Sequence, residues 1–306
     1  MSQLTQRFQN IFQLQDHYFE IIGCGAIGSF TAMNLARAGA TNFSLWDPDT
    51  VDPVNIGVQH YDLTHIGNSK VKMLSKQMSA INPNVDIITH RQKFNNHTTT
   101  GYYHQGISTS SDYRRRKTFF IIGIDNMAGR KQIVEDLIWR CSSGRYWTRD
   151  KYVYNQTYVI DARMGSETFQ MYYWELINKE VGTNIARKKL AVEEIEQERR
   201  EFSYDSDSYK NCNDRITSLK SEVEDIENAA INSFQESYLQ EWYSDENGDS
   251  EPCNARSTNY CASMAGAFIN NQIRKLVDSS SPSNPNLVFN FPSMALKCKT
   301  NYNLRK

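Results

Sequence analysis

The feature that most constrains this chain is a glycine-rich turn between a short apolar strand and a helical segment. Residues 18–22 read YFEII, the turn GCGAIGS follows, and FTAMNLARAGA continues with helical spacing. In such a turn Gly23 allows a sharp change of direction, Gly25 lets the backbone approach a phosphate, and Gly28 lets the helix pack closely on the strand. From Ala26 onwards, the first helical residues offer unpaired N–H groups to an anion.

A carboxylate stands where the ribose of a bound nucleotide is expected. The second apolar strand, at 43–46, ends at Asp47, nineteen residues after Gly28. A carboxylate at the end of this strand accepts hydrogen bonds from ribose hydroxyls. Together with the turn, Asp47 favours an adenosine-nucleotide site over a purely structural glycine turn. Up to this point the pattern fits NAD as well as ATP.

Strands alternate with helices over the first half of the chain, which predicts an α/β fold. Because parallel strands need crossover helices, we expect a Rossmann-like, doubly wound and mainly parallel sheet. Helical spacing at 67–82 ends at Asn82-Pro83, where proline disfavours continuation. The other expected elements are helices at about 129–141 and 257–277 and strands at 85–88, 119–124, 158–164 and 167–174, with 287–291 as the last strand.

The middle of the chain has a different character, because residues 180–250 are rich in charged side chains. We interpret them as a helical, coiled-coil-like insertion whose first helix spans about 184–202, and we expect this hairpin to cover its own apolar seam and to project near the nucleotide crevice. The alternative is a solvated charged arm with no function beyond packing. The apolar seam of the second helix has 3-4-3-4 spacing and comprises Ile216, Leu219, Val223, Ile226 and Ala230. The expected division is a nucleotide-binding core at 1–179, an insertion at 180–250 and a return to the core at 251–306.

Composition argues against several other classes of protein. The net charge is −1, so no basic field favours nucleic acid or an anionic membrane surface. No run of 18 apolar residues is present, and the N-terminus is polar, so we expect a cytoplasmic protein. The six cysteines are widely spaced without a C-x-x-C pair, which argues against a disulfide framework or a four-cysteine zinc site.

The residues after Asp47 distinguish between the candidate nucleotides. They form an ordered series: DPDTVDPVNIGVQHY at 47–61, IGNSKV at 66–71, INPNV at 81–85 and GIDNMAGR at 123–130. Over about residues 18–165 this series closely resembles the ThiF/MoeB family, whose relatives include the ubiquitin-activating enzymes. DARMGSE at 161–167 and CNARSTNY at 253–260 resemble a divergent branch of that family found in phages and mobile elements.

The resemblance implies an enzyme that uses ATP and Mg²⁺ to adenylate a carboxylate. The implied substrate is the C-terminal carboxylate of a small ubiquitin-like or carrier protein. The implied assembly is a homodimer, in which Arg7 supplies a cation to the partner subunit. The implied nucleotide site comprises Asp47 and Asp49 for the ribose side, Asn55 and Gln59 beside the phosphates, Lys70 for the triphosphate, Asp125 for magnesium, and Asn126 and Arg130 in the following turn.

Two departures from the family pattern keep other functions open: the residue at position 58, and the absence of the paired C-x-x-C zinc motifs found in sulfur-carrier activators. Val58 stands where many members carry a phosphate-contacting arginine, which favours a degenerate binding module without turnover. An NAD-dependent oxidoreductase is a third hypothesis, although Lys70 and the D-N-x-x-x-R element are not needed for hydride transfer. Taken alone, Lys70 fits a surface lysine and Asp125-Asn126 fits a helix N-cap.

The family also suggests a catalytic thiol that accepts the activated carboxyl group as a thioester. Cys253 and Cys212 fall in the segment where relatives carry that thiol. Cys253 lies near Arg256 and a helix start, both of which favour a thiolate. We therefore weigh Cys253 as a nucleophile against a structural role.

Overall fold

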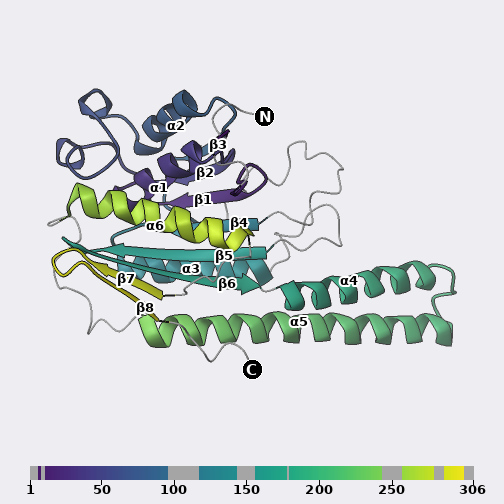
Figure 1. The fold of residues 1–306 in the computed structure, drawn as a ribbon. Coiled ribbons are helices and arrows are strands. Elements are labelled where there is room, and N and C mark those ends of the chain that lie inside the picture. Colours follow the sequence, from purple (N-terminus) through teal and green to yellow (C-terminus); the bar gives the residue numbers. More distant parts are fainter. Residues whose placement is uncertain are drawn as a thin grey trace.

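One eight-stranded sheet forms the centre of the described structure (Figure 1). The computed structural model describes residues 6–7, 11–95, 117–142, 156–177, 179–242, 257–278 and 286–299. The strands are β1 (Tyr18–Ile22), β2 (Asn42–Trp46), β3 (Asp86–His90), β4 (Lys117–Ile122), β5 (Gln156–Met164), β6 (Thr168–Ile177), β7 (Asn286–Asn290) and β8 (Ala295–Lys299). The helices are α1 (Ala26–Arg37), α2 (Lys70–Ile81), α3 (Met127–Ser142), α4 (Lys179–Arg199), α5 (Asp207–Trp242) and α6 (Asn259–Asp278).

The order of the strands creates a reversal point beside β1. The sheet runs β3-β2-β1-β4-β5-β6-β7-β8, with β1 to β5 parallel and the remaining neighbours antiparallel. The chain therefore moves outward from β1 through β2 to β3 and then returns to the other side of β1 as β4. In open sheets of this kind, ligands bind at the carboxyl ends of the strands where the order reverses. The glycine turn after β1 lies at that place.

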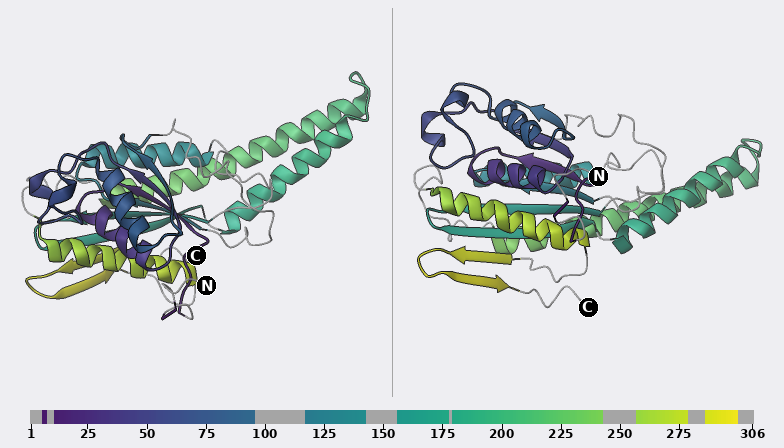
Figure 2. Two further views of the ribbon diagram at one scale, coloured as in Figure 1. Left: turned by 90° about the horizontal axis from the view of Figure 1, so that it is seen from above. Right: turned by 45° about the horizontal axis from the view of Figure 1, so that its top comes forward.

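Helices cover both faces of the sheet, which confirms the doubly wound α/β fold (Figure 2). On one face, α1, α2 and α6 share a large apolar core with the strands. On the other face, α3 packs on a second core built around Trp46 and Phe120. β4 is buried at all six positions, as its continuous apolar sequence predicted for a strand covered on both faces.

The final part of the sheet corrects one expectation. The strand expected as the last one is β7, but β8 follows it and pairs with it antiparallel. The turn between them contains neither Gly nor Asn at its left-handed position, because Met294 has a φ of 51°. Without the usual glycine signal, the short ALKCK strand gave no recognisable hairpin pattern.

The charged middle segment forms two antiparallel helices, α4 and α5, that pack against each other. Their shared apolar cluster comprises Val192, Ile195, Cys212 and Ile216, with Leu219 packed against it. Ion pairs join the two helices along their length: Lys188–Glu222, Lys189–Glu227, Glu196–Lys220 and Glu198–Arg215. The helices thus cover each other around this cluster, which includes Ile216 and Leu219 of the expected seam, whereas the Ala230 side chain lies outside the described part of the structure. No described helix, α5 included, is both long and apolar enough to cross a membrane.

The place where this hairpin leaves the sheet corrects a second expectation. We expected an insertion in this position to project near the nucleotide crevice. Instead, the end of β6 at Ile177 pairs with Thr157 at the start of β5, so α4 begins at the edge opposite the glycine turn. From there the hairpin extends away from the α/β body (Figures 1 and 2). The antiparallel direction of β6 causes the difference.

Candidate nucleotide site

The glycine turn brings β1, α1 and the end of β4 into close contact. Gly23 has a φ of +92°, and a Cβ atom there would lie 2.9 Å from the carbonyl oxygen of Gly123. A Cβ atom at Gly28 would lie 1.8 Å from the carbonyl oxygen of Gly23, so α1 approaches β1 more closely than any side chain permits. Around Gly25 the space is open, with only Gln59 Nε2 at 3.8 Å from its Cβ position.

The N-terminus of α1 is left available at this turn. Gly25 is the N-cap residue, and neither a side-chain cap nor an acidic residue of the first turn covers the helix start. Backbone N–H groups at an uncapped helix start carry partial positive charge and favour an anion. The open space at Gly25 and the uncapped N–H groups from Ala26 onwards suit a phosphate.

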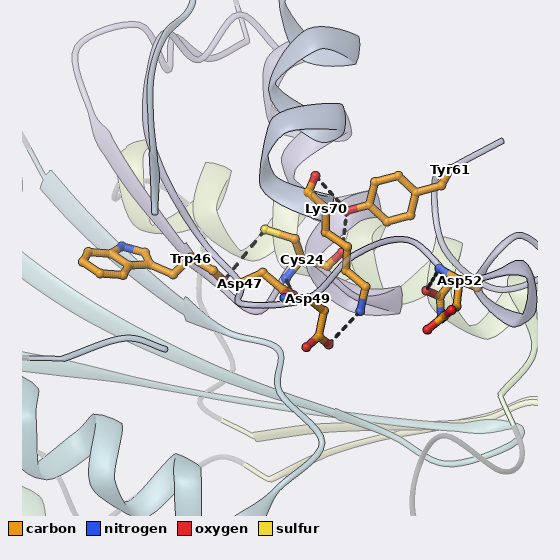
Figure 3. Close-up of polar contacts among 8 residues, drawn as sticks. Cys24, Trp46, Asp47, Asp49, Asp52, Tyr61 and Lys70 are labelled. Carbon is orange, nitrogen blue, oxygen red and sulfur yellow. Dashed lines mark hydrogen bonds and ion pairs between the residues drawn. The ribbon is translucent and has the colours of Figure 1, made fainter. Parts of the chain in front are cut away.

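Asp47 is buried at the end of β2 and holds the turn from one side (Figure 3). Its Oδ2 accepts the Cys24 N–H at 2.7 Å, and its Oδ1 accepts the Asp49 N–H at 2.8 Å. Burial raises the pKa of Asp47, and the nearby Lys70 ammonium opposes that shift. A carboxylate accepts about four hydrogen bonds, so Asp47 retains capacity for ribose hydroxyls.

Lys70 is brought to the same site from the start of α2. Its backbone N–H donates to the Asp49 carbonyl at 3.0 Å, and its Nζ lies 3.1 Å from Asp49 Oδ2. Lys70 is buried, whereas the Asp49 side chain is 62% exposed. The sequence predicted both residues for the site but not their ion pair. A phosphate ligand at this place would therefore have to share Lys70 with Asp49.

The segment between Asp47 and Lys70 supplies two amide side chains. Asn55 Oδ1 accepts the Asp52 N–H at 2.8 Å, which leaves its NH₂ group as the donor. Gln59 Oε1 is buried and has no hydrogen-bond partner among the described residues. A buried polar atom without a partner is costly unless a water or ligand satisfies it. The Gln59 oxygen therefore needs a donor from a bound water or ligand, and the Gln59 Nε2 group, which lies beside Gly25, is the one that can donate to a phosphate.

The loop after β4 carries the third part of the site. Asp125 and Asn126 are both exposed there. Asn126 Oδ1 accepts the Gly129 N–H at 2.9 Å, so Asn126 caps α3, as the N-cap alternative expected. No group of three or more His, Cys, Asp or Glu side chains in the described part of the chain is arranged to hold a metal. The Asp125 carboxylate has no partner within that part.

Arg130 lies beneath this loop rather than at its surface. Its buried guanidinium pairs with the fully buried Asp161 and donates to the carbonyl oxygens of Ile124 and Ala162. Arg163 binds the other oxygen of Asp161 at 3.0 Å. Because its guanidinium is engaged in this way, we assign Arg130 to positioning the loop that carries Asp125. The DARMGSE motif at 161–167 contains Asp161, but nothing in its sequence identifies Asp161 as the partner of Arg130.

The remaining candidates fall outside this cluster. Arg7 lies in an exposed turn near the N-terminus, and Cys253 lies outside the described residues. Cys212 is buried between α4 and α5, which excludes it as an accessible nucleophile in this structure. Burial and the neighbouring Asp47 raise the pKa of the Cys24 thiol well above its usual value, so this thiol stays protonated.

Comparison with known proteins identifies relatives over different lengths of the chain. The sequence profile of the ThiF family matches residues 7–299. A tRNA threonylcarbamoyladenosine dehydratase of Bacillus subtilis (strain 168) is 30% identical over 95 residues, 31% of this chain and 37% of that protein. The ubiquitin-like modifier-activating enzyme 5 of Drosophila grimshawi is 35% identical over 99 residues, 32% of this chain and 24% of that protein. The matches span well under half the length of these relatives.

Solved structures share the fold at low sequence identity. E. coli MccB with ATP superposes with a TM-score of 0.52 at 13% identity, covering 97% of this chain and 66% of that chain. PaaA superposes with a TM-score of 0.51 at 14% identity, covering 94% of this chain and 64% of that chain. At such identities the likeness establishes the shared fold.

Proposed function

Because this chain belongs to the ThiF family, we propose that it catalyses the ATP-dependent adenylation of a carboxylate. The observation that carries the proposal is the meeting of three elements at one edge of the sheet. These are the uncapped start of α1, the buried carboxylate of Asp47 and the Lys70–Asp49 pair. Each suits a different part of ATP: the α-phosphate, the ribose and the terminal phosphates.

In the proposed reaction, an oxygen of the substrate carboxylate attacks the α-phosphorus of ATP. A new bond joins that oxygen to the phosphorus, the bond to the bridging oxygen of the β-phosphate breaks, and pyrophosphate leaves with the electron pair. Asp47 holds the ribose, while the N–H groups at Gly25 and Ala26 and the amides of Asn55 and Gln59 donate to phosphate oxygens. Preorganised donors of this kind stabilise charge that develops in the transition state.

The residues present fit a magnesium ion bound together with the nucleotide. Mg²⁺ is usually held by one or two carboxylates plus substrate phosphates rather than by a full set of protein ligands. Asp125 offers such a carboxylate, because it is exposed and has no hydrogen-bond partner in the described part of the chain. When bound, the ion neutralises negative charge on the phosphates. Lys70 adds a second positive charge from the protein itself.

For the substrate, we propose the C-terminal carboxylate of a small ubiquitin-like or carrier protein. The similarity to a ubiquitin-like modifier-activating enzyme supports this choice. The similarity to a tRNA threonylcarbamoyladenosine dehydratase makes a modified tRNA nucleoside the second substrate class to test. We further propose a cytoplasmic homodimer in which Arg7 reaches the partner subunit, and a thioester on Cys253 after adenylation.

Val58 favours a second candidate function, a binding module without turnover. Val58 follows the segment that supplies Asn55 and precedes Gln59, and it brings no positive charge to the phosphates. Such a module would bind ATP and still fail to form pyrophosphate. An NAD-dependent oxidoreductase, in contrast, would be stabilised against heat by NAD rather than by ATP with magnesium.

Exchange of labelled pyrophosphate into ATP separates these functions. Candidate carboxylates are peptides ending in Gly-Gly, small ubiquitin-like proteins and tRNA whose modified nucleoside carries a carboxylate, with unmodified tRNA as the negative control. We expect exchange with a protein carboxylate, and its loss in Lys70→Ala and Asp125→Ala. Lys72→Ala and Glu135→Ala are the matched controls: Lys72 is exposed on α2 near Lys70, and Glu135 is exposed on α3, the helix that follows the loop of Asp125. ATP binding without exchange for any of these carboxylates would favour the binding module.

A further inference from the structure

Tyr61 connects the glycine turn to the helix that carries Lys70. Its ring is buried, and its hydroxyl donates to the Cys24 carbonyl oxygen at 2.8 Å (Figure 3). The same hydroxyl lies 3.4 Å from the Lys70 carbonyl oxygen. A phenol has one proton, so the shorter contact with Cys24 identifies the main acceptor.

Cys24 is therefore held through both of its backbone polar groups. Asp47 Oδ2 accepts its N–H at 2.7 Å, and Tyr61 binds its carbonyl oxygen. One contact comes from Asp47, directly after β2, and the other comes from Tyr61, in the segment that precedes α2. Together they fix the two peptide groups that flank Cys24.

Fixing the Cys24 carbonyl also fixes the next N–H group, that of Gly25. A trans peptide is planar, and its C=O and N–H bonds point in opposite directions. Because the Cys24 carbonyl points at Tyr61, the Gly25 N–H points away from Tyr61. No described residue accepts a hydrogen bond from this N–H, and the space beside Gly25 is open except for Gln59.

We propose that Tyr61 is a positioning residue that aims the Gly25 N–H at the α-phosphate of the nucleotide. The assignment rests on the proposed nucleotide site. Glycine at position 25 makes such a restraint necessary, because a peptide that precedes glycine can rotate into conformations that a side chain would exclude. Tyr61 lies behind the turn and does not itself contact the nucleotide.

The hydroxyl of Tyr61 keeps its proton under ordinary conditions. Burial raises the pKa of Tyr61 well above its usual value, and the neighbouring Cys24 and Asp47 add to the shift. Tyr61 is therefore a hydrogen-bond donor at neutral pH. Phenylalanine keeps the buried ring and removes only this donor, which makes Tyr61→Phe the informative variant.

The test compares AMP with adenosine by calorimetry, since the two differ only in the α-phosphate. In Tyr61→Phe we expect AMP to bind about tenfold more weakly and adenosine within about twofold of the original chain. Tyr158→Phe is the control, because it removes a buried hydroxyl that interacts with Glu175 outside the site. Equal weakening of AMP and adenosine in Tyr61→Phe would overturn the assignment, as would unchanged AMP binding.

A second readout observes the Gly25 amide directly. In protein labelled with ¹⁵N-glycine, AMP should shift the Gly25 resonance of the original chain, and Tyr61→Phe should reduce that shift. A full shift in Tyr61→Phe contradicts the proposal even if affinity changes. The protein could fail to exchange pyrophosphate and still prefer AMP over adenosine in a way that depends on Tyr61. That result would count against adenylation but would support the role of Tyr61.

Discussion

Replacing Gly28 by alanine tests the close approach of α1 to β1. A Cβ atom at position 28 would lie 1.8 Å from the Gly23 carbonyl oxygen and 2.9 Å from the carbonyl carbon. Since real Cβ atoms essentially never come closer than 3.0 Å, α1 must move by at least about 1.2 Å. Both groups next to the new methyl are backbone, so no flexible side chain can make room.

The expected cost follows from this displacement. Inserting a methyl group into a well-packed region costs about 1–3 kcal/mol, and a clash with backbone belongs at the upper end, about 3 kcal/mol. Urea denaturation should show a lower midpoint with an unchanged slope. Movement of α1 also displaces the Gly25 N–H, so AMP affinity should fall together with stability.

Two other glycines provide matched controls. Gly57 has open space at its Cβ position and no positive φ, so Gly57→Ala should be neutral or slightly stabilising. Gly67 is equally open but has a φ of +79°, so Gly67→Ala measures backbone strain alone, about 1 kcal/mol. If Gly28→Ala destabilises no more than Gly67→Ala, the close approach at the turn is not what requires glycine.

Three further predictions concern Asp47, Arg130 and the α4–α5 hairpin. Burial raises the pKa of Asp47 above 3.8, and protonation of this carboxylate removes the acceptor for the ribose hydroxyls. Adenosine affinity should therefore fall on acidification with a midpoint above pH 3.8, and a midpoint at or below pH 3.8 would contradict this prediction. Arg130→Met removes one partner of the fully buried Asp161 and should lower the free energy of unfolding by about 3 kcal/mol in urea titrations. Lys131→Met, at the exposed neighbouring position, is the control, and its free energy of unfolding should stay within about 0.5 kcal/mol of the original chain's. Similar losses of stability in the two variants would refute the buried ion pair. Replacing residues 190–220 by a short Gly-Ser bridge removes the hairpin's apolar cluster. AMP affinity measured by calorimetry should stay unchanged, because α4 starts at the edge of the sheet opposite the glycine turn. A loss of AMP affinity would contradict this placement.

Local sequence patterns were sufficient to predict the parallel half of the fold. The apolar run that forms β4 indicated a strand buried on both faces, and Asn82-Pro83 marked the end of α2. The glycine turn and Asp47 indicated a nucleotide site because their spacing reflects one strand-turn-helix unit and the following strand. In each case the signal lies within a short stretch of chain.

Features that depend on the order and direction of distant strands could not be predicted in this way. The Arg130–Asp161 pair requires that β5 lie beside β4, and the exit of the hairpin requires that β6 run antiparallel. The hydrogen bond from Tyr61 to Cys24 joins residues 37 positions apart through a turn with no regular periodicity. The β7–β8 hairpin was missed because its left-handed residue is Met294 rather than glycine.

Calorimetric binding of a stable mimic of the adenylated product tests the central claim most directly. Glycylglycyl-sulfamoyladenosine carries the acyl chain and the adenosine in one molecule and needs no protein partner. An adenylating enzyme binds its reaction intermediate more tightly than its separate parts, so the mimic should bind at least about tenfold more tightly than AMP. Because Asp47 is proposed to hold the ribose, which AMP and the mimic both carry, Asp47→Ala should weaken the binding of both. Tighter binding of NAD than of AMP and the mimic, or a mimic that binds no better than AMP, would contradict adenylation.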